Sequence, residues 1–167
     1  MPRGTDAKTI MSAAGVRRGY TLLTFYIIEV IKDLGTQPSL DKLMEAAEKQ
    51  GVIIAREMRK EMPLRLTLLE TGVNVYRRFM ADAGADVTIH KRDEESVIFV
   101  VRRCPFHEAF LDVGVDCGIF LKGLCSNLTL PAIQATLSQF DPRLKVENVL
   151  ARQSAEEICM ERVYLTR

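Results

Sequence analysis

Residues 86–101 read DVTIHKRDEESVIFVV, and the fold class turns on this stretch because the hydrophobic period changes within it. Val87 and Ile89 alternate with polar residues, and 97–101 is a run of β-branched and aromatic residues, both typical of strands. The acidic triplet at 93–95 separates the two runs and indicates a turn. The stretch therefore predicts a β-hairpin.

Three helices are expected before this hairpin. Apolar residues recur at helical spacing over 20–34, and a glycine and a proline follow, which is a common stop signal. Ser39 is a typical N-cap for a second helix over 40–58, and the same spacing predicts a third helix over 63–81. Residues 1–16 lack a period and are predicted to form a flexible N-terminal arm.

Short helices and a second pair of strands are expected after the hairpin. The patterns predict helices over 105–111, 116–124 and 131–140, and strands over 144–150 and 158–165. The order is then ααα-ββ-αα(α)-ββ. Helices segregated from antiparallel strands in this way predict an α+β fold, with one domain over 17–167.

Composition excludes several functional classes. The chain has 167 residues, a net charge of +1 and no apolar run near the ~20 residues of a membrane span. We therefore expect neither a nucleic-acid partner nor a membrane partner. The N-terminus lacks the apolar core of a leader peptide, which predicts a cytoplasmic protein in which disulfides are disfavoured.

Cys104-Pro105-Phe106-His107 is the first candidate for chemistry. The proline places Cys104 at the start of a helix, where the helix dipole is expected to lower the pKa of the thiol. His107 follows one helical turn later, and Cys-x-x-His is a metal-ligand spacing. A buried thiol beside a surface histidine is the alternative.

Three further residues could join this pair. Cys125 ends a helical stretch and is favoured as a ligand, whereas Cys117 is expected to fill the core. Cys159 lies in the last strand on the same face as Glu161, and a lone strand cysteine is usually a core residue. Glu147 in the neighbouring strand is either an oxygen ligand, a general base or an exposed carboxylate.

Other catalytic motifs are missing from the sequence. It contains no glycine-rich phosphate loop, no Gly-x-Ser-x-Gly and no His-Glu-x-x-His. The second histidine, His90, follows Ile89 in the first strand and is expected to face solvent.

The C-terminal half resembles a known family. The features are Cys104-Pro105 after a strand, a cysteine about twenty residues later, the turn 140–147 (Phe-Asp-Pro-x-Leu-x-Val-Glu), and a final strand with a cysteine. They resemble the L-2-amino-thiazoline-4-carboxylic acid hydrolase family. That family is similar in turn to 4-vinyl reductase-like domains, which bind small ligands in phenol-sensing regulators and also occur in vesicle-tethering subunits.

The resemblance implies a metal site within residues 104–165. Sensor-type relatives hold zinc through cysteines and a glutamate, which maps onto Cys125 and Cys159, with Cys104 as a third candidate. Ala151 stands where those relatives have a cysteine, eight residues before Cys159. The fourth ligand is then Glu147, Cys104 or His107.

Three functions follow from this site. The first is a metal-dependent hydrolase of a small cyclic amidine or thiazoline-type acid. Zinc would be held by Cys104, Cys125 and Cys159, with His107 as an alternative ligand. The bound zinc would activate a water molecule. His107 or Glu147 would transfer protons, and Arg102 or Arg103 would bind the carboxylate of the substrate. The second is a non-catalytic ligand-binding or sensory domain with a structural metal. The third is an iron–sulfur protein that uses the same cysteines.

The expected partners are a small-molecule ligand or substrate and a second copy of the chain. The N-terminal helices have extensive apolar faces, which predict a homodimer.

Overall fold

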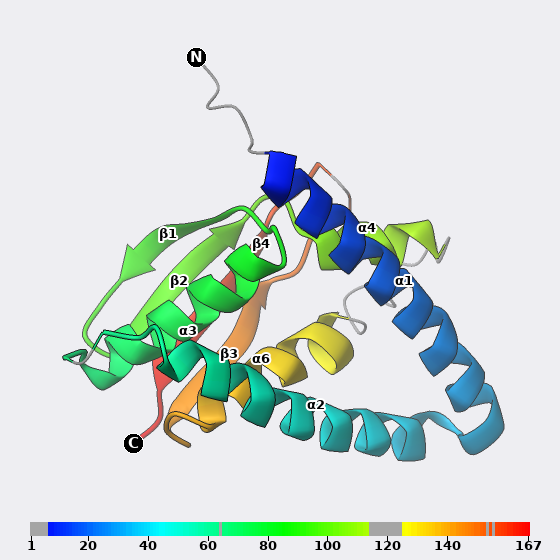
Figure 1. The fold of residues 1–167 in the computed structure, drawn as a ribbon, viewed down its shortest axis with the longest axis horizontal. Helices are drawn as coiled ribbons and strands as arrows, with labels where there is room; N and C mark the ends of the chain where they lie inside the picture. The colour runs from blue at the N-terminus through cyan, green and yellow to red at the C-terminus, as the bar shows by residue number, and fades with distance from the viewer. Residues whose placement is uncertain (1–6, 64, 114–124, 153, 155) are drawn as a thin grey trace.

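A computed structural model of the chain describes residues 7–63, 65–113, 125–152, 154 and 156–167. The predicted α+β class is confirmed, with helices first and strands after them (Figure 1). The helical elements are α1 (Ala7–Leu34), α2 (Thr36–Arg59), α3 (Leu68–Asp82), α4 (Pro105–Asp112), the π-helical turn η1 (Cys125–Thr129) and α6 (Leu130–Ser138). The strands are β1 (Val87–Arg92), β2 (Ser96–Val101), β3 (Leu144–Leu150) and β4 (Cys159–Leu165).

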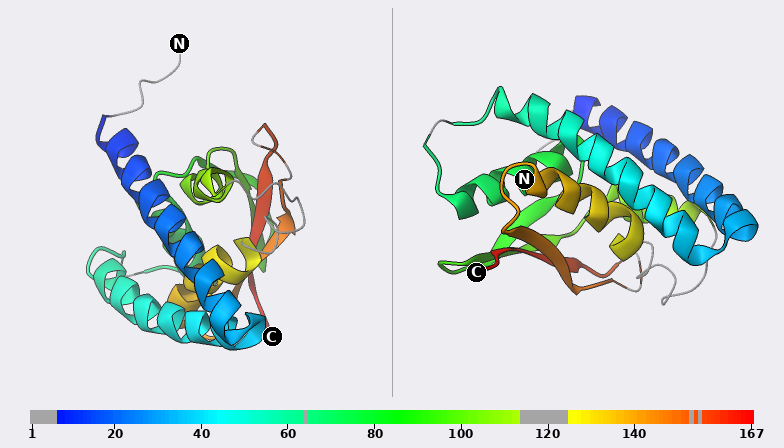
Figure 2. Two further views of the ribbon diagram at one scale, coloured as in Figure 1. Left: turned by 90° about the vertical axis from the view of Figure 1, so that its right-hand side faces the viewer. Right: turned by 90° about the horizontal axis from the view of Figure 1, so that it is seen from below.

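The four strands form one antiparallel sheet in the order β1-β2-β4-β3. The hairpin predicted over 86–101 is present as β1 and β2. The last strand, β4, lies between β2 and β3, so the C-terminal segment completes the middle of the sheet. The described helices lie on one face of the sheet: α3 and α6 lie against it, and α1 and α2 form an outer layer (Figure 2).

The first two helices differ from expectation at their ends. Residues 7–16, expected in an arm, lie within α1. The second helix begins at Thr36, and Ser39 lies inside its first turn, where its hydroxyl donates to the Gly35 carbonyl oxygen. Gly35 adopts a φ of 85°, which lets the chain reverse between the two helices.

The third helix begins later than expected because a capping box marks its start. Thr67 accepts a hydrogen bond from the backbone N–H of Glu70, and the Glu70 carboxylate accepts one from the backbone N–H of Thr67. These reciprocal bonds satisfy two amide groups that the helix itself cannot pair. Pro63 therefore lies in the connection, outside the helix.

Thr67→Ala is expected to lower the free energy of unfolding by about 1 kcal/mol, because it removes the acceptor for the Glu70 amide. Urea denaturation of both proteins measures this difference. Thr71→Ala, within the same helix, is the control and should change stability by less than about 0.5 kcal/mol. Equal losses for the two variants would mean that the box does not stabilise the helix.

The core lies between the sheet and the inner helices. The largest fully buried side chains include Tyr76 and Met80 from α3, Phe99 from β2, Phe110 from α4 and Ile133 from α6. The rings of Tyr76 and Phe99 are 4.5 Å apart between centroids. The helices therefore bury the inner face of the sheet, and any polar group on that face must find a partner inside the protein.

Part of the apolar surface of α1 faces outward. Leu22 is 72% exposed and Tyr26 is 63% exposed, and Phe25 lies between them on the same helix. The homodimer expected from this helix stays a prediction, and sedimentation of the full chain measures it. Among the described helices, none has the length and hydropathy needed to cross a bilayer.

Candidate functional site

Three cysteines from distant parts of the sequence line one cavity. Cys104 precedes the first turn of α4, Cys125 opens η1, and Cys159 is the first residue of β4. Cys159 pairs with Val101 across the sheet, which brings it close to the end of β2 and the start of α4. The cavity is small, about 20 Å3. All three thiols are free of disulfides.

Five polar side chains share the walls of this cavity with the thiols: His107, Thr129, Asn148, Arg152 and Glu161. Arg152 is only 5% exposed and Glu161 only 3%. Charged residues are seldom buried to this degree unless they are paired. The partners of these two side chains therefore determine the chemistry of the site.

The Arg152 guanidinium is held by a thiol and a carbonyl group. Its Nε donates to Cys159 Sγ at 3.1 Å, and its Nη2 donates to the Val101 carbonyl oxygen at 2.5 Å. These bonds link the segment after β3 to the paired ends of β2 and β4. Among the described residues, no carboxylate forms an ion pair with Arg152.

The buried carboxyl of Glu161 is held from the other side by α3. Tyr76 Oη donates to Glu161 Oε2 at 2.6 Å, and both residues are buried. Burial raises the pKa of Glu161, although the Tyr76 hydrogen bond and the charge of Arg152 act in the opposite direction. Burial also raises the pKa of Tyr76 well above its usual value.

Two of the thiols, Cys104 and Cys125, have raised pKa values. Burial raises the pKa of Cys104 to about 12, and the neighbouring His107 amide offsets this only in part. The expectation of a lowered pKa at the helix start is therefore wrong, because loss of solvation outweighs the helix dipole at this depth. The pKa of Cys125 is also raised well above its usual value, again by burial first.

His107 lies inside the protein, not on its surface. It is 9% exposed, and its Nε2 atom is buried without a hydrogen-bond partner among the described residues. Burial, aided by the charge of Arg152, lowers the pKa of His107 to about 4. The ring is therefore neutral at pH 7.

This lowered pKa predicts a loss of stability in acid. Between the unfolded value of 6.5 and the folded value of about 4, the unfolded chain binds a proton that folded His107 does not. Stability from this group is thus full above the unfolded pKa and falls as the pH drops towards 4. Between about pH 7 and 4.5, wild type should lose about 1–2 kcal/mol more unfolding free energy than His107→Gln.

Urea denaturation at the two pH values measures this difference. Glu161 titrates in the same cavity, and Glu108 and Arg152 act on His107 electrostatically, but all three groups are common to both proteins. Parallel pH profiles for wild type and His107→Gln would contradict the prediction.

The remaining candidates from the sequence lie outside the cavity. Arg102 and Arg103 are exposed and contact Thr88 and Glu108, respectively. Glu147 is half-buried and forms an ion pair with Arg162 at 2.6 Å. His90 is exposed, as expected, and Cys117 lies outside the described residues.

The donor set does not fit the metal ion that the family resemblance implies. In the described part of the chain, no group of three or more His, Cys, Asp or Glu side chains is arranged to hold a metal ion. Cys159 Sγ already accepts a hydrogen bond from a buried cation, Arg152, which would repel a second cation. Cys104 and Cys125 would first have to lose protons that burial makes hard to remove.

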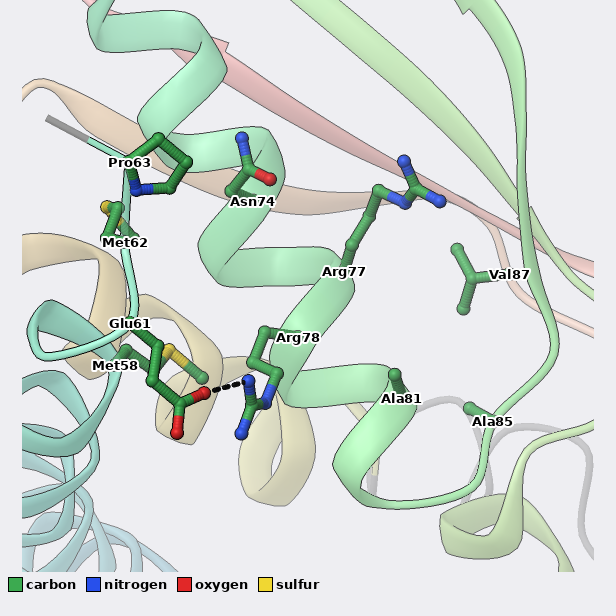
Figure 3. Close-up of a pocket in the computed structure, with 10 residues that line it drawn as sticks. All are labelled: Met58, Glu61, Met62, Pro63, Asn74, Arg77, Arg78, Ala81, Ala85 and Val87. Carbon is green, nitrogen blue, oxygen red and sulfur yellow. Dashed lines mark hydrogen bonds and ion pairs between the residues drawn. The ribbon is translucent and has the colours of Figure 1, made fainter. Parts of the chain in front are cut away.

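A second hollow lies on the surface between α3, the start of β1 and the chain after α2 (Figure 3). It is an open groove of about 430 Å3 with two methionines, Met58 and Met62, in its wall. Arg78 forms an ion pair with Glu61 at 2.6 Å, and Arg77 extends away from that pair towards Val87. Among the described residues that line this groove, none is a histidine or a cysteine, so the thiol-lined cavity is the better candidate site.

Comparisons with known proteins place the fold. No protein-family model matches the chain, and no curated protein matches it either. Among solved structures, the chain is similar to trafficking protein particle complex subunit 3 from Naegleria fowleri, which was crystallised covalently bound to palmitic acid. The TM-score is 0.61 at 16% identity, over 95% of this chain and 96% of that one. At this identity the likeness concerns the fold alone. The expected hydrolase family gains no support from these comparisons.

Four polar residues of the site were not among the sequence candidates: Thr129, Asn148, Arg152 and Glu161. Strand alternation placed Glu161 beside Cys159, so its burial was available from the pattern. Arg152 lies in a polar segment that resembles an ordinary turn, and no local signal marks it as buried. Only the pairing of β4 with β2 brings the Val101 carbonyl within its reach.

Proposed function

We propose that the chain is a non-catalytic, small-ligand-binding domain that uses the thiol-lined cavity as its binding site. The observation that carries the proposal is the cavity itself, an enclosed space in the core where three thiols meet a buried arginine, histidine and glutamate. Mostly apolar walls with a few convergent polar groups are typical of small-molecule sites. A buried cluster of titratable groups with shifted pKa values is also typical of functional sites.

The state of the thiols favours binding over catalysis. A cysteine nucleophile or ligand acts as the thiolate, and burial raises the pKa of both Cys104 and Cys125. His107 is three residues from Cys104, but its Nε2 makes no hydrogen bond to that thiol or to any other described group. An activated cysteine–histidine pair requires such a bond.

The size of the cavity indicates the size of the ligand. Trafficking protein particle complex subunit 3 carries a covalently bound palmitic acid. The cavity in this chain is about 20 Å3, which is room for one water molecule and far less than a long acyl chain needs. We propose a ligand of a few heavy atoms, and because the space holds only about one water molecule, the walls must move apart to admit it. Intact-mass measurement of the purified protein provides a direct check, because a long-chain thioester would appear as a mass increment that hydroxylamine removes.

A cavity-filling variant tests the proposal. Ala151 lines the cavity without contributing a polar group, so Ala151→Leu should fill the space and leave the hydrogen bonds in place. With acetamide and acetate as probes, wild type should show a saturable rise in Tm, and Ala151→Leu should show none. Ala14→Leu, at an exposed position of α1, is the matched control and should respond like wild type. An identical response of Ala151→Leu and wild type would place binding elsewhere and refute the proposal.

The zinc site and the iron–sulfur cluster stay predictions, and metal analysis tests both. Wild type, Cys104→Ser, Cys125→Ser and Cys159→Ser are to be compared after anaerobic purification. The proposed binding domain should contain little metal in all four proteins. One zinc per chain in wild type, lost in the serine variants, would instead favour the metal-dependent hydrolase, and one cluster per chain would favour the iron–sulfur protein.

A further inference from the structure

The buried charge of Arg152 has no counter-ion in ion-pair contact among the described residues. The guanidinium donates to a neutral carbonyl group and to a thiol. Burying an uncompensated charge is costly, and proteins usually offset that cost with an opposite charge. Glu161 is the acidic residue among the described residues that line the cavity, but it is bonded to Tyr76, and burial disfavours its ionised form.

Three further polar groups of the cavity have no hydrogen-bond partner in the described part of the protein. They are His107 Nε2, Thr129 Oγ1 and Asn148 Nδ2, and all three atoms are buried. Unpaired buried polar atoms are rare and call for an explanation. The three residues line the same cavity as Arg152, although they come from α4, η1 and β3, respectively.

We propose that the cavity binds the carboxylate group of a small organic acid, with Arg152 as its counter-ion and Asn148 and His107 as hydrogen-bond donors. A carboxylate has two oxygens that accept several hydrogen bonds and a single negative charge. It would therefore satisfy the unpaired donors and neutralise Arg152 at once. Neutral His107 serves as a donor when its proton is on Nε2. The inference rests on the proposed binding function and names the chemical class of the ligand.

The size of the site narrows this class. The cavity has a volume of about 20 Å3, which is less than even the smallest organic acids occupy. Its walls must therefore move apart to admit the ligand, and the smallest acids require the least movement. Acetate is therefore a suitable probe. Acetamide is its neutral counterpart, with nearly the same shape and one oxygen replaced by an NH2 group, which donates and cannot accept.

The experiment compares acetate with acetamide at constant ionic strength, balanced with chloride. For wild type we expect acetate to raise Tm saturably and to bind at least about tenfold more tightly than acetamide. NMR of the full chain reports the site directly: acetate should shift the Arg152 Nε–H and Asn148 side-chain signals. This readout uses wild type, so it does not depend on whether a variant folds.

Three variants assign the contacts. Arg152→Gln should weaken acetate binding at least about tenfold, and Asn148→Leu by about threefold to tenfold. Arg102→Gln is the matched control, because Arg102 is an exposed arginine outside the cavity, and acetate binding should not change.

The outcomes separate this inference from the proposed function. If acetamide binds as tightly as acetate, and Ala151→Leu abolishes both, the cavity is a ligand site and the carboxylate inference is wrong. If neither probe shifts Tm or the NMR signals, both the inference and the proposed function fail. If Arg102→Gln weakens acetate binding as much as Arg152→Gln does, the anion binds to the surface and the inference is overturned.

Discussion

Gly51→Ala is expected to lower the free energy of unfolding by about 2–4 kcal/mol. Gly51 lies in α2 where that helix crosses α6. A Cβ atom at this position would lie 2.7 Å from the backbone carbonyl carbon of Ala135 and 2.9 Å from the backbone nitrogen of Thr136. Backbone atoms cannot rotate away as a side chain can, so the two helices would have to separate.

The sign of this effect distinguishes packing from helix propensity. In an exposed helix, alanine is more stable than glycine by about 0.5–1 kcal/mol. Gly15 and Gly19 in α1 have no atom within 4 Å of an added Cβ, so Gly15→Ala and Gly19→Ala should stabilise the protein. Urea denaturation of the three variants measures the effects. A stabilising Gly51→Ala would mean that α2 and α6 do not approach each other this closely.

Tyr76→Phe is expected to cost about 2–3 kcal/mol, because it removes the hydrogen bond donated to the buried carboxyl of Glu161. The ring and its contact with Phe99 are retained, so the loss reports the hydroxyl group. Tyr26→Phe is the matched control. Tyr26 is exposed, and loss of its hydroxyl should change stability by less than about 0.5 kcal/mol.

A double-mutant cycle isolates the Tyr76–Glu161 pair. Glu161→Leu alone leaves the Tyr76 hydroxyl buried without its acceptor, whereas the double variant Tyr76→Phe/Glu161→Leu removes both partners. The double variant should therefore be more stable than the sum of the single losses predicts, by about 1.5–3 kcal/mol. Additive losses would show that the two side chains do not stabilise each other.

Much of the fold could be predicted because the periods of its helices and strands are local properties. The alternation at 87–89 and the run 97–101 correspond to β1 and β2, and Pro105 marks the start of α4. Helix starts were less predictable. Ser39 has the residue type of an N-cap, but Gly35 with its positive φ sets the start of α2, and the reciprocal Thr67–Glu70 bonds set the start of α3.

The candidate site was predictable only in part. The sequence singled out Cys104, Cys125 and Cys159, and the structure brings them to one cavity. It also suggested Arg102 or Arg103 as the residue that binds a substrate carboxylate. Arg102 is exposed, whereas Arg152, fifty residues away, reaches the end of the same strand from inside.

By itself, the sequence determined where helices and strands form, because side-chain periodicity, proline and glycine act over a few neighbouring residues. It also determined which cysteine thiols could take part in a site. Only the tertiary structure decided which polar groups were buried, since the environment of Arg152, Glu161 and His107 depends on β4 pairing between β2 and β3 and on helices packing over that sheet. Burial in turn raised the pKa of Cys104, although the local sequence places this thiol at the start of a helix, where the dipole lowers the pKa. Burial outweighs the dipole because loss of solvation depends on all the atoms that surround the thiol.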